Sequence, residues 1–243
     1  WCGAIRLIFS PQKCTSPPTA SSTREMAFKV LVLPAPLAPI SATVSPLATL
    51  KLTPLTAATT RHLFILTGAS RGIGRAIAEA LAPDHHLLIG GRDAAAVDAV
   101  VAGLPSAEPF VCELTDDTAV ETAVAGMESL DVLVHSAGGS PLGAVADVGP
   151  EVWRDVLAVN LVAPANLTRL LLPALRRASG HVVFINSGAG LTARAGWSAY
   201  AASKFGLRAL ADSLRAEENG VVKVTSIHPG RTATDMQRAV REF

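Results

Sequence analysis

The sequence predicts an α/β protein in which helices cover both faces of a doubly wound parallel sheet. From Arg61 onward, apolar runs of strand length alternate with Ala- and Leu-rich stretches of helical length. Continuous apolar strands separated by helices are typical of a parallel sheet buried on both faces. The first apolar run also leads directly into a glycine-rich turn and then a helix. Right-handed crossovers place the ligand crevice of such a sheet at the carboxyl ends of its strands.

The expected strands are six short apolar runs, at residues 63–67, 86–90, 108–112, 131–136, 181–186 and 221–227. The helices expected between them cover residues 72–82, 93–103, 116–127, 150–178 and 198–218. Pro164 and Pro173 lie inside the long helix 150–178, so we expect it to be kinked. A seventh strand is not expected, because residues 236–243 are too few and too polar.

The composition changes near residue 60. Residues 1–60 hold eight of the sixteen prolines, one of the nineteen glycines, and five basic residues against one acidic residue. Prolines also interrupt the apolar stretch 30–50, which therefore does not read as a simple membrane-spanning helix. We expect residues 1–60 to be a disordered or non-native extension, with a transit peptide as the alternative. Residues 61–243 are expected to form the dinucleotide-binding catalytic domain.

Several function classes are disfavoured by composition. The 243 residues carry a net charge of +1, and 17% of them are charged, so no basic field points to nucleic acid. The three cysteines form no CxxC pair and the six histidines no pair at i,i+4, so neither a disulfide framework nor a metal site is expected. We expect a cytoplasmic protein with no nucleic-acid or membrane partner.

A glycine turn, TGASRGIG at residues 67–74, separates the first strand from its helix. Glycines let the backbone approach a pyrophosphate, whose charge then lies at a helix N-terminus. The turn therefore predicts a dinucleotide site, with a purely structural turn as the alternative. Its TGxxxGxG spacing resembles the classical short-chain dehydrogenase/reductase (SDR) family, which has a Rossmann-type fold, and the resemblance covers about residues 62–243. The resemblance assigns cofactor contacts to Gly68, Ser70, Arg71, Gly72, Ile73 and Gly74.

The choice of cofactor depends on the end of the second strand. An acidic residue there would accept the ribose 2′-hydroxyl of NAD, whereas arginine accommodates the 2′-phosphate of NADP. This chain has Gly91 where NAD-dependent members have the acid, and Arg92 follows it. Arg71 is a second cation near the same phosphate, so we expect NADP(H) rather than NAD(H). Asp93 is expected to cap the next helix.

Two cofactor segments depart from the family pattern. The third strand ends in CEL at residues 112–114, with glutamate where the family has aspartate near the adenine. The fourth ends in HSAG at residues 135–138 instead of NNAG, so we expect a looser sheet or cofactor contact at Ser136 and only packing at His135. After the sixth strand comes a Pro-Gly segment that resembles the family's nicotinamide-contacting loop. These segments add the expected contacts Glu113, Leu114, Ser136, Ala137, Gly138, Pro229, Gly230, Thr234 and Thr232, the last with an ordinary turn as its alternative.

The only tyrosine of the chain, Tyr200, lies four residues before Lys204. Positions i and i+4 share one face of a helix, so both side chains are expected to project into the crevice. Ser187 ends the fifth strand 13 residues earlier, and the order Ser, then Tyr-x-x-x-Lys, resembles the catalytic set of the family. Asn160, on the long helix, resembles its fourth member.

These residue types fit hydride reduction of a carbonyl, which requires a proton donor at the oxygen. The pKa of free tyrosine, near 10, is high for this role, and we expect the Lys204 ammonium to lower it. Tyr200 is then the general acid in reduction and the base in oxidation, while Ser187 stabilises the charge on the substrate oxygen. By family analogy, Tyr200 and Lys204 also contact the cofactor, and Asn160 holds a water that relays protons to Lys204.

The expected function is therefore that of an NADP(H)-dependent oxidoreductase interconverting an alcohol and a ketone or aldehyde. A catalytically silent nucleotide-binding regulator and an inactive fragment of such an enzyme are the alternatives. The family normally continues with a substrate-covering segment and a last strand, so we expect a C-terminally truncated member whose full-length relatives are homo-oligomeric. Pocket candidates at residues 140–142 and 191–197 are mostly apolar, with Arg194 as the charged exception, which leaves the substrate open.

Overall fold

The computed structural model describes residues 62–230, 232, 234 and 236. It also gives the backbone of two short strands, β1 (Ala4–Leu7) and β2 (Val30–Leu33), which pair antiparallel. The expected extension at residues 1–60 otherwise lies outside the described residues, as does nearly all of the segment 231–243. The described part is therefore the expected catalytic domain.

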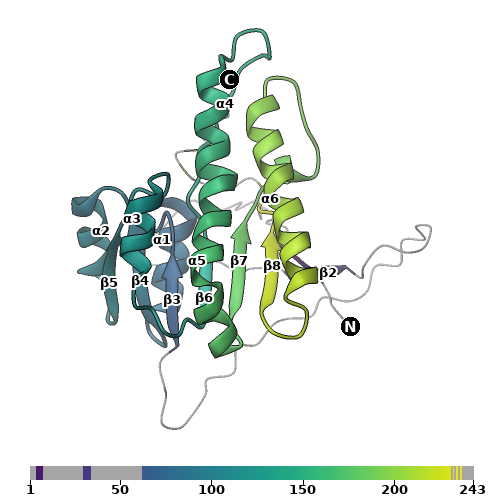
Figure 1. Ribbon diagram of the computed structural model, residues 1–243. Coiled ribbons are helices and arrows are strands. Elements are labelled where there is room, and N and C mark those ends of the chain that lie inside the picture. Colours follow the sequence, from purple (N-terminus) through teal and green to yellow (C-terminus); the bar gives the residue numbers. More distant parts are fainter. Residues whose placement is uncertain are drawn as a thin grey trace, which may run out of the picture.

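The described domain contains a parallel sheet of six strands in the order β5-β4-β3-β6-β7-β8 (Figure 1). The chain runs outward from β3 through β4 to β5, then crosses back to β6 on the other side of β3, so the order reverses between β3 and β6. In doubly wound sheets this reversal opens the ligand crevice. The strands agree with the expected runs within two residues: β3 (Leu63–Leu66), β4 (His86–Gly91), β5 (Ala107–Val111), β6 (Val132–His135), β7 (His181–Ile185) and β8 (Lys223–Ile227).

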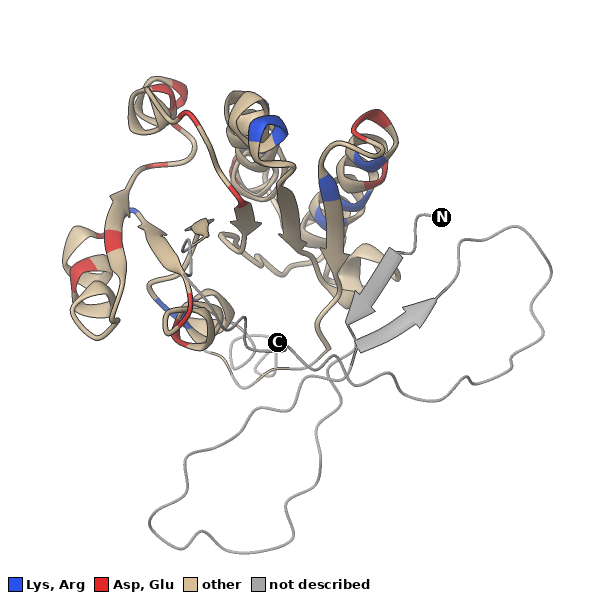
Figure 2. Cartoon of the chain, turned by 90° about the horizontal axis from the view of Figure 1, so that it is seen from below, with Lys and Arg blue, Asp and Glu red and all other residues tan. Residues whose placement is uncertain are grey.

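Helices lie on both sides of the sheet, as the end-on view in Figure 2 shows. Alternate strand residues supply two cores because side chains in a strand alternate between faces. Ile65 and Leu133 face a core completed by α3, α5 and α6, whereas Leu66 and Val134 face one completed by α1 and α2. The helices are α1 (Gly72–Leu81), α2 (Ala94–Val101), α3 (Asp117–Val124), α4 (Pro150–Leu157), α5 (Ala163–Ala178) and α6 (Ser198–Glu217).

The expected long helix is interrupted by a π-helical turn, Ala158–Val162, between α4 and α5. Pro164 accounts for the position of this π-helical turn, because proline has no N–H to donate to the carbonyl of Asn160, four residues earlier. The N–H of Ala163 instead donates to the carbonyl of Ala158, five residues back. Helix α5 continues through Pro173, so the interruption expected from the two prolines occurs only near the first.

The segment Pro150–Ala178 is long and apolar enough to cross a membrane by length and composition alone. The core helix of a soluble protein passes the same test. Of its apolar 18-residue window, 39% is buried inside the fold, and Leu167, Leu171 and Leu175 of this segment lie in the core beside the sheet.

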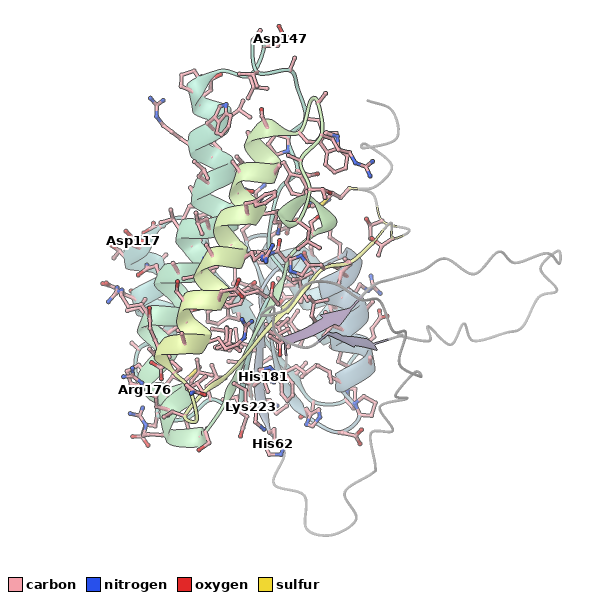
Figure 3. The ribbon with its side chains drawn as sticks, turned by 90° about the vertical axis from the view of Figure 1, so that its right-hand side faces the viewer. His62, Asp117, Asp147, Arg176, His181 and Lys223 are labelled. Atoms are coloured by element: carbon pink, nitrogen blue, oxygen red, sulfur yellow. The ribbon has the colours of Figure 1, made fainter. Side chains whose placement is uncertain are left out.

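The amino and carboxyl ends of the strands lie at opposite ends of the domain. Figure 3 shows His62, His181 and Lys223, which precede or begin β3, β7 and β8, gathered at one end, with Asp147 at the other. The candidate site is at the carboxyl ends of the strands.

Asp93 caps α2 by accepting a hydrogen bond from the N–H of Ala96 at 3.2 Å, as expected from the sequence.

Candidate active site

The glycine turn is closed tightly against the loop that follows β6. Gly68 has φ of 62° and Gly72 has φ of 59°, a region that favours glycine. A Cβ on Gly68 would lie 2.6 Å from Cα of Ala137, and one on Gly74 would lie 2.4 Å from the carbonyl oxygen of Gly68. Arg71 occupies the N-cap of α1 without a capping hydrogen bond from its side chain. The turn thus forms a small-residue cradle at a helix N-terminus, as a pyrophosphate site requires.

Thr67 connects the two central strands beneath this turn. Its hydroxyl oxygen accepts hydrogen bonds from the N–H groups of Ser136 at 3.0 Å and Ala137 at 3.2 Å, and it donates to the carbonyl of Val134. Thr67 thus links β3 to the end of β6 at Ser136, while the looser contact expected from serine at this position stays a prediction.

Tyr200 and Ser187 meet at the carboxyl end of the sheet. Tyr200 lies in the first turn of α6 and is 7% exposed, and its hydroxyl lies near the side chain of Ser187, the residue after which the 3₁₀ turn Gly188–Gly190 begins. Burial raises the pKa of Tyr200, and the interaction with Ser187 lowers it by a smaller amount. In this structure burial of the phenol thus outweighs the interaction that lowers its pKa, and the lowering expected beside Lys204 and a bound oxidised nicotinamide stays a prediction.

Lys204 is buried one helical turn after Tyr200. Its Nζ donates to the carbonyl of Ile185 at 3.2 Å, and no carboxylate of the described residues forms an ion pair with it. Burial without a carboxylate partner lowers the pKa of Lys204 to about 8. A Cβ on Gly138 would lie 3.7 Å from this Nζ, so the ammonium reaches the loop that follows β6.

Asn160 is fully buried in the π-helical turn and connects that loop to α6. Its Nδ2 donates to the carbonyl of Gly139 and to Oγ of Ser203, and its Oδ1 accepts from the N–H of Gly139, each at 2.9 Å. Ser203 in turn donates to the carbonyl of Tyr200 at 2.7 Å. Asn160 therefore holds the helix that carries the tyrosine, and both amide hydrogens are used within the protein.

These features belong to one known family. The family model described as short chain dehydrogenase matches residues 62–243. This chain belongs to the short-chain dehydrogenase family. Members are oxidoreductases that use a nicotinamide cofactor, which agrees with the cradle and with the Ser, Tyr and Lys at the carboxyl ends of the strands.

Relatives and solved structures agree with this membership. Dehydrogenase/reductase SDR family member 7B of Bos taurus is 39% identical over 189 residues, and the match covers 71% of this chain and 58% of the relative. Human Dehydrogenase/reductase SDR family member 4 is 33% identical over 186 residues, covering 72% of this chain and 67% of the relative. A short-chain dehydrogenase from Streptomyces avermitilis has a TM-score of 0.69 and 35% identity, covering 74% of this chain and 69% of that structure.

The residues at the end of β4 that are expected to determine the choice of cofactor lie beside the glycine turn. A Cβ on Gly91 would be 3.6 Å from Oγ of Ser70. The Arg92 side chain is 82% exposed, with Nη1 3.8 Å from Oε2 of Glu113. Oε1 of Glu113 accepts hydrogen bonds from the N–H and the hydroxyl of Thr115. The carboxylate expected near the adenine is thus directed toward Thr115 and Arg92 in this structure.

Some of the remaining expected cofactor contacts lie at the glycine turn, whereas others pack in the cores. A Cβ on Gly72 would be 3.7 Å from Cγ2 of Thr234, which brings the Pro-Gly segment to the glycine turn, and the N–H of Thr234 donates to the carbonyl of Thr232. Pro229 is buried and Gly230 is exposed. The side chains of Ile73 and Leu114 pack against the two cores. His135 packs as expected: it stacks on Phe184, and burial lowers its pKa to about 3.

A hydrogen-bond network around the Ser187 backbone was not predicted from the sequence. Nδ1 of His228 lies 2.8 Å from the carbonyl oxygen of Ser187, which can only accept, so Nδ1 carries the proton. Nε2 of a neutral ring then accepts from Ser226, whose oxygen is 3.2 Å away, and Ser226 accepts from Asn186. Oδ1 of Asn186 accepts the N–H of Ser187 at 2.9 Å. Side chains therefore hold both backbone polar groups of Ser187.

Proposed function

We propose that this chain interconverts a carbonyl compound and its alcohol with NADP(H), using Tyr200 as proton donor in reduction and acceptor in oxidation. The observation that carries the proposal is the placement of the buried Tyr200 near Ser187 at the carboxyl ends of the strands, with Lys204 buried one helical turn away. When bound, the cofactor supplies or accepts hydride at the substrate carbon. The chain's own residues then have to hold the oxygen and move its proton.

The residues present fit a dinucleotide. Gly68 and Gly74 leave no room for a side chain where the turn closes, and the first N–H groups of α1 would face the pyrophosphate. By family analogy, Tyr200 and Lys204 would hold the nicotinamide ribose. The contacts expected at Ser136, Ala137, Gly138, Thr232 and the other positions named above belong to the same proposal.

In reduction, the Tyr200 hydroxyl gives its proton to the substrate oxygen while Ser187 donates a hydrogen bond to it. Because burial holds the pKa of Lys204 near 8, its ammonium can lose and regain a proton near neutral pH and so restore the proton on Tyr200. The Asn160 side chain has no free amide hydrogen, so we place the relay water at its backbone carbonyl, to which Pro164 cannot donate.

The proposal is tested by following NADPH oxidation at 340 nm with a panel of aldehydes and ketones, compared with NADPH binding measured by fluorescence titration. We expect oxidation that depends on a carbonyl substrate. Binding of NADPH without oxidation by any member of the panel would favour a regulator, and absence of binding would indicate an inactive fragment.

The preference for NADP(H) follows from Gly91 and the two arginines. Arg71 and Arg92 are exposed and Gly91 leaves no acid beside Ser70. A short-chain dehydrogenase from Shigella flexneri, 30% identical with a TM-score of 0.66, was solved in complex with NADP, which supports the same choice here.

Replacing Arg92 by aspartate is expected to weaken NADPH binding about tenfold or more, because a charge-assisted contact is lost and repulsion is added. NADH, which has no 2′-phosphate, should bind with an affinity changed by much less. Fluorescence titration with both cofactors measures the difference. The matched control is Arg154→Asp, an exposed arginine on α4. Equal effects of Arg92→Asp on both cofactors would contradict the assignment.

Two further parts of the proposal concern the whole protein: a cytoplasmic location and, for full-length members, self-association. The exposed apolar side chains of Val162 and Phe205 support the second part. A Cβ on Gly206 would lie 2.8 Å from Cδ2 of Leu161, so the π-helical turn and α6 are in contact next to these two residues.

A further inference from the structure

Two segments that flank Tyr200 are joined to each other. The N–H of Gly143 donates to the carbonyl of Gly196 at 2.8 Å, and Gly143 also forms an isolated parallel bridge with Trp197. Gly196 has φ of 74°, which favours glycine at this turn. The loop after β6 and the segment before α6 thus lie side by side, next to the catalytic tyrosine.

Within the second segment, three side chains form a continuous series. The Trp197 ring meets the Tyr200 ring edge-on, with centroids 6.1 Å apart and the planes at 60°. The guanidinium carbon of Arg194 lies 5.7 Å from the centroid of the Trp197 ring. A cation is therefore held on an aromatic surface that leads to the proposed proton donor.

Arg194 is the only charged residue in the two segments, residues 139–143 and 188–200. It forms no ion pair with a carboxylate of the described residues, and its side chain is exposed. A guanidinium offers a planar fork of donors that matches a carboxylate. The cation is thus available to a ligand that reaches Tyr200.

We propose that Arg194 binds an anionic group of the substrate, so that the site favours carbonyl compounds that carry a carboxylate. This inference rests on the proposed function of Tyr200. The two centroid distances place the guanidinium carbon within about 12 Å of the phenol ring, so both groups fall within one small molecule. An aromatic or flat spacer between carbonyl and carboxylate would pack on Trp197.

The test uses two probes that share the aldehyde and differ in charge, 4-formylbenzoate and its methyl ester. Their binding is measured by calorimetry to the NADPH-saturated Tyr200→Phe variant, whose turnover is expected to be too slow to consume the probe during the titration, and their reduction is measured with the wild-type chain. We expect the carboxylate to bind about tenfold or more tightly than the ester, as one charge-assisted contact allows. In the double variant Tyr200→Phe/Arg194→Gln, the ratio of the two affinities should fall below about threefold, while the affinity for the ester should not change.

Arg208→Gln is the matched control, since Arg208 is an exposed arginine on α6 that forms an ion pair with Asp212. It should retain the full ratio. Equal binding of the two probes, binding of neither, or a ratio that survives Arg194→Gln would overturn the proposal. Preference for the carboxylate in binding, together with no NADPH oxidation by the wild-type chain, would instead contradict the proposed function and leave the anion site standing.

Discussion

Replacement of Tyr200 by phenylalanine is expected to lower turnover by a factor of about 100 to 10,000. The change removes one hydroxyl, and with it the proton donor that the carbonyl oxygen requires. The Tyr200 ring is buried and in contact with Trp197, and phenylalanine retains the ring and hence this packing. Carbonyl-dependent NADPH oxidation and NADPH binding, measured on the same preparation, separate loss of chemistry from loss of the site.

The comparison for this variant is Ser187→Ala, which removes the neighbouring hydroxyl that lowers the pKa of Tyr200 but not the proton donor. It should reduce turnover as well and, because that hydroxyl lowers the pKa of Tyr200, should move the tyrosine pKa upward. Tyr200→Phe with turnover close to the wild-type value would refute the mechanism.

The regular elements of the fold could be predicted from the sequence because local patterns determine them. Apolar runs of fixed length place β3 to β8, and Asp93 marks the start of α2 through its side chain. Helix α3 ends three residues before its expected end, and Gly126, with φ of 78°, follows two residues later. A single glycine in a polar stretch does not show by itself which residue of the helix will be the last.

The supports of the site could not be predicted, because they join residues that are distant in the chain. Ser203 lies 43 residues from Asn160 and His228 lies 41 residues from Ser187, yet each pair is hydrogen-bonded or joined through the backbone. The spacing of Tyr200 and Lys204 showed that they share a helix face. It did not show how deeply the face is buried, and depth of burial determines the direction of both pKa shifts.

Replacement of Lys204 by methionine is expected to abolish turnover and, at the same time, to stabilise the fold. Lys204 is 6% exposed, and its ammonium donates a hydrogen bond to the Ile185 carbonyl. Burial lowers the pKa of Lys204 from 10.5 to about 8, which corresponds to about 3 kcal/mol of folding free energy lost at pH 7. Methionine fills the same space without a charge, so the free energy of unfolding should rise by about 2–3 kcal/mol at pH 7.

The pH dependence of this gain distinguishes a buried charge from better packing. Between pH 8 and 10.5 the unfolded lysine still binds a proton that the folded one has released, so wild-type stability rises with pH relative to the variant. The difference in free energy of unfolding between Lys204→Met and wild type, measured with urea, should therefore be largest at pH 7. It should shrink toward zero as the pH approaches 10.5. Lys223→Met, at the exposed first residue of β8, is the matched control and should show no such trend. A stability difference that stays constant with pH would mean that Lys204 is not held as a buried, weakened ammonium, and the proton relay assigned to it would lose its physical basis.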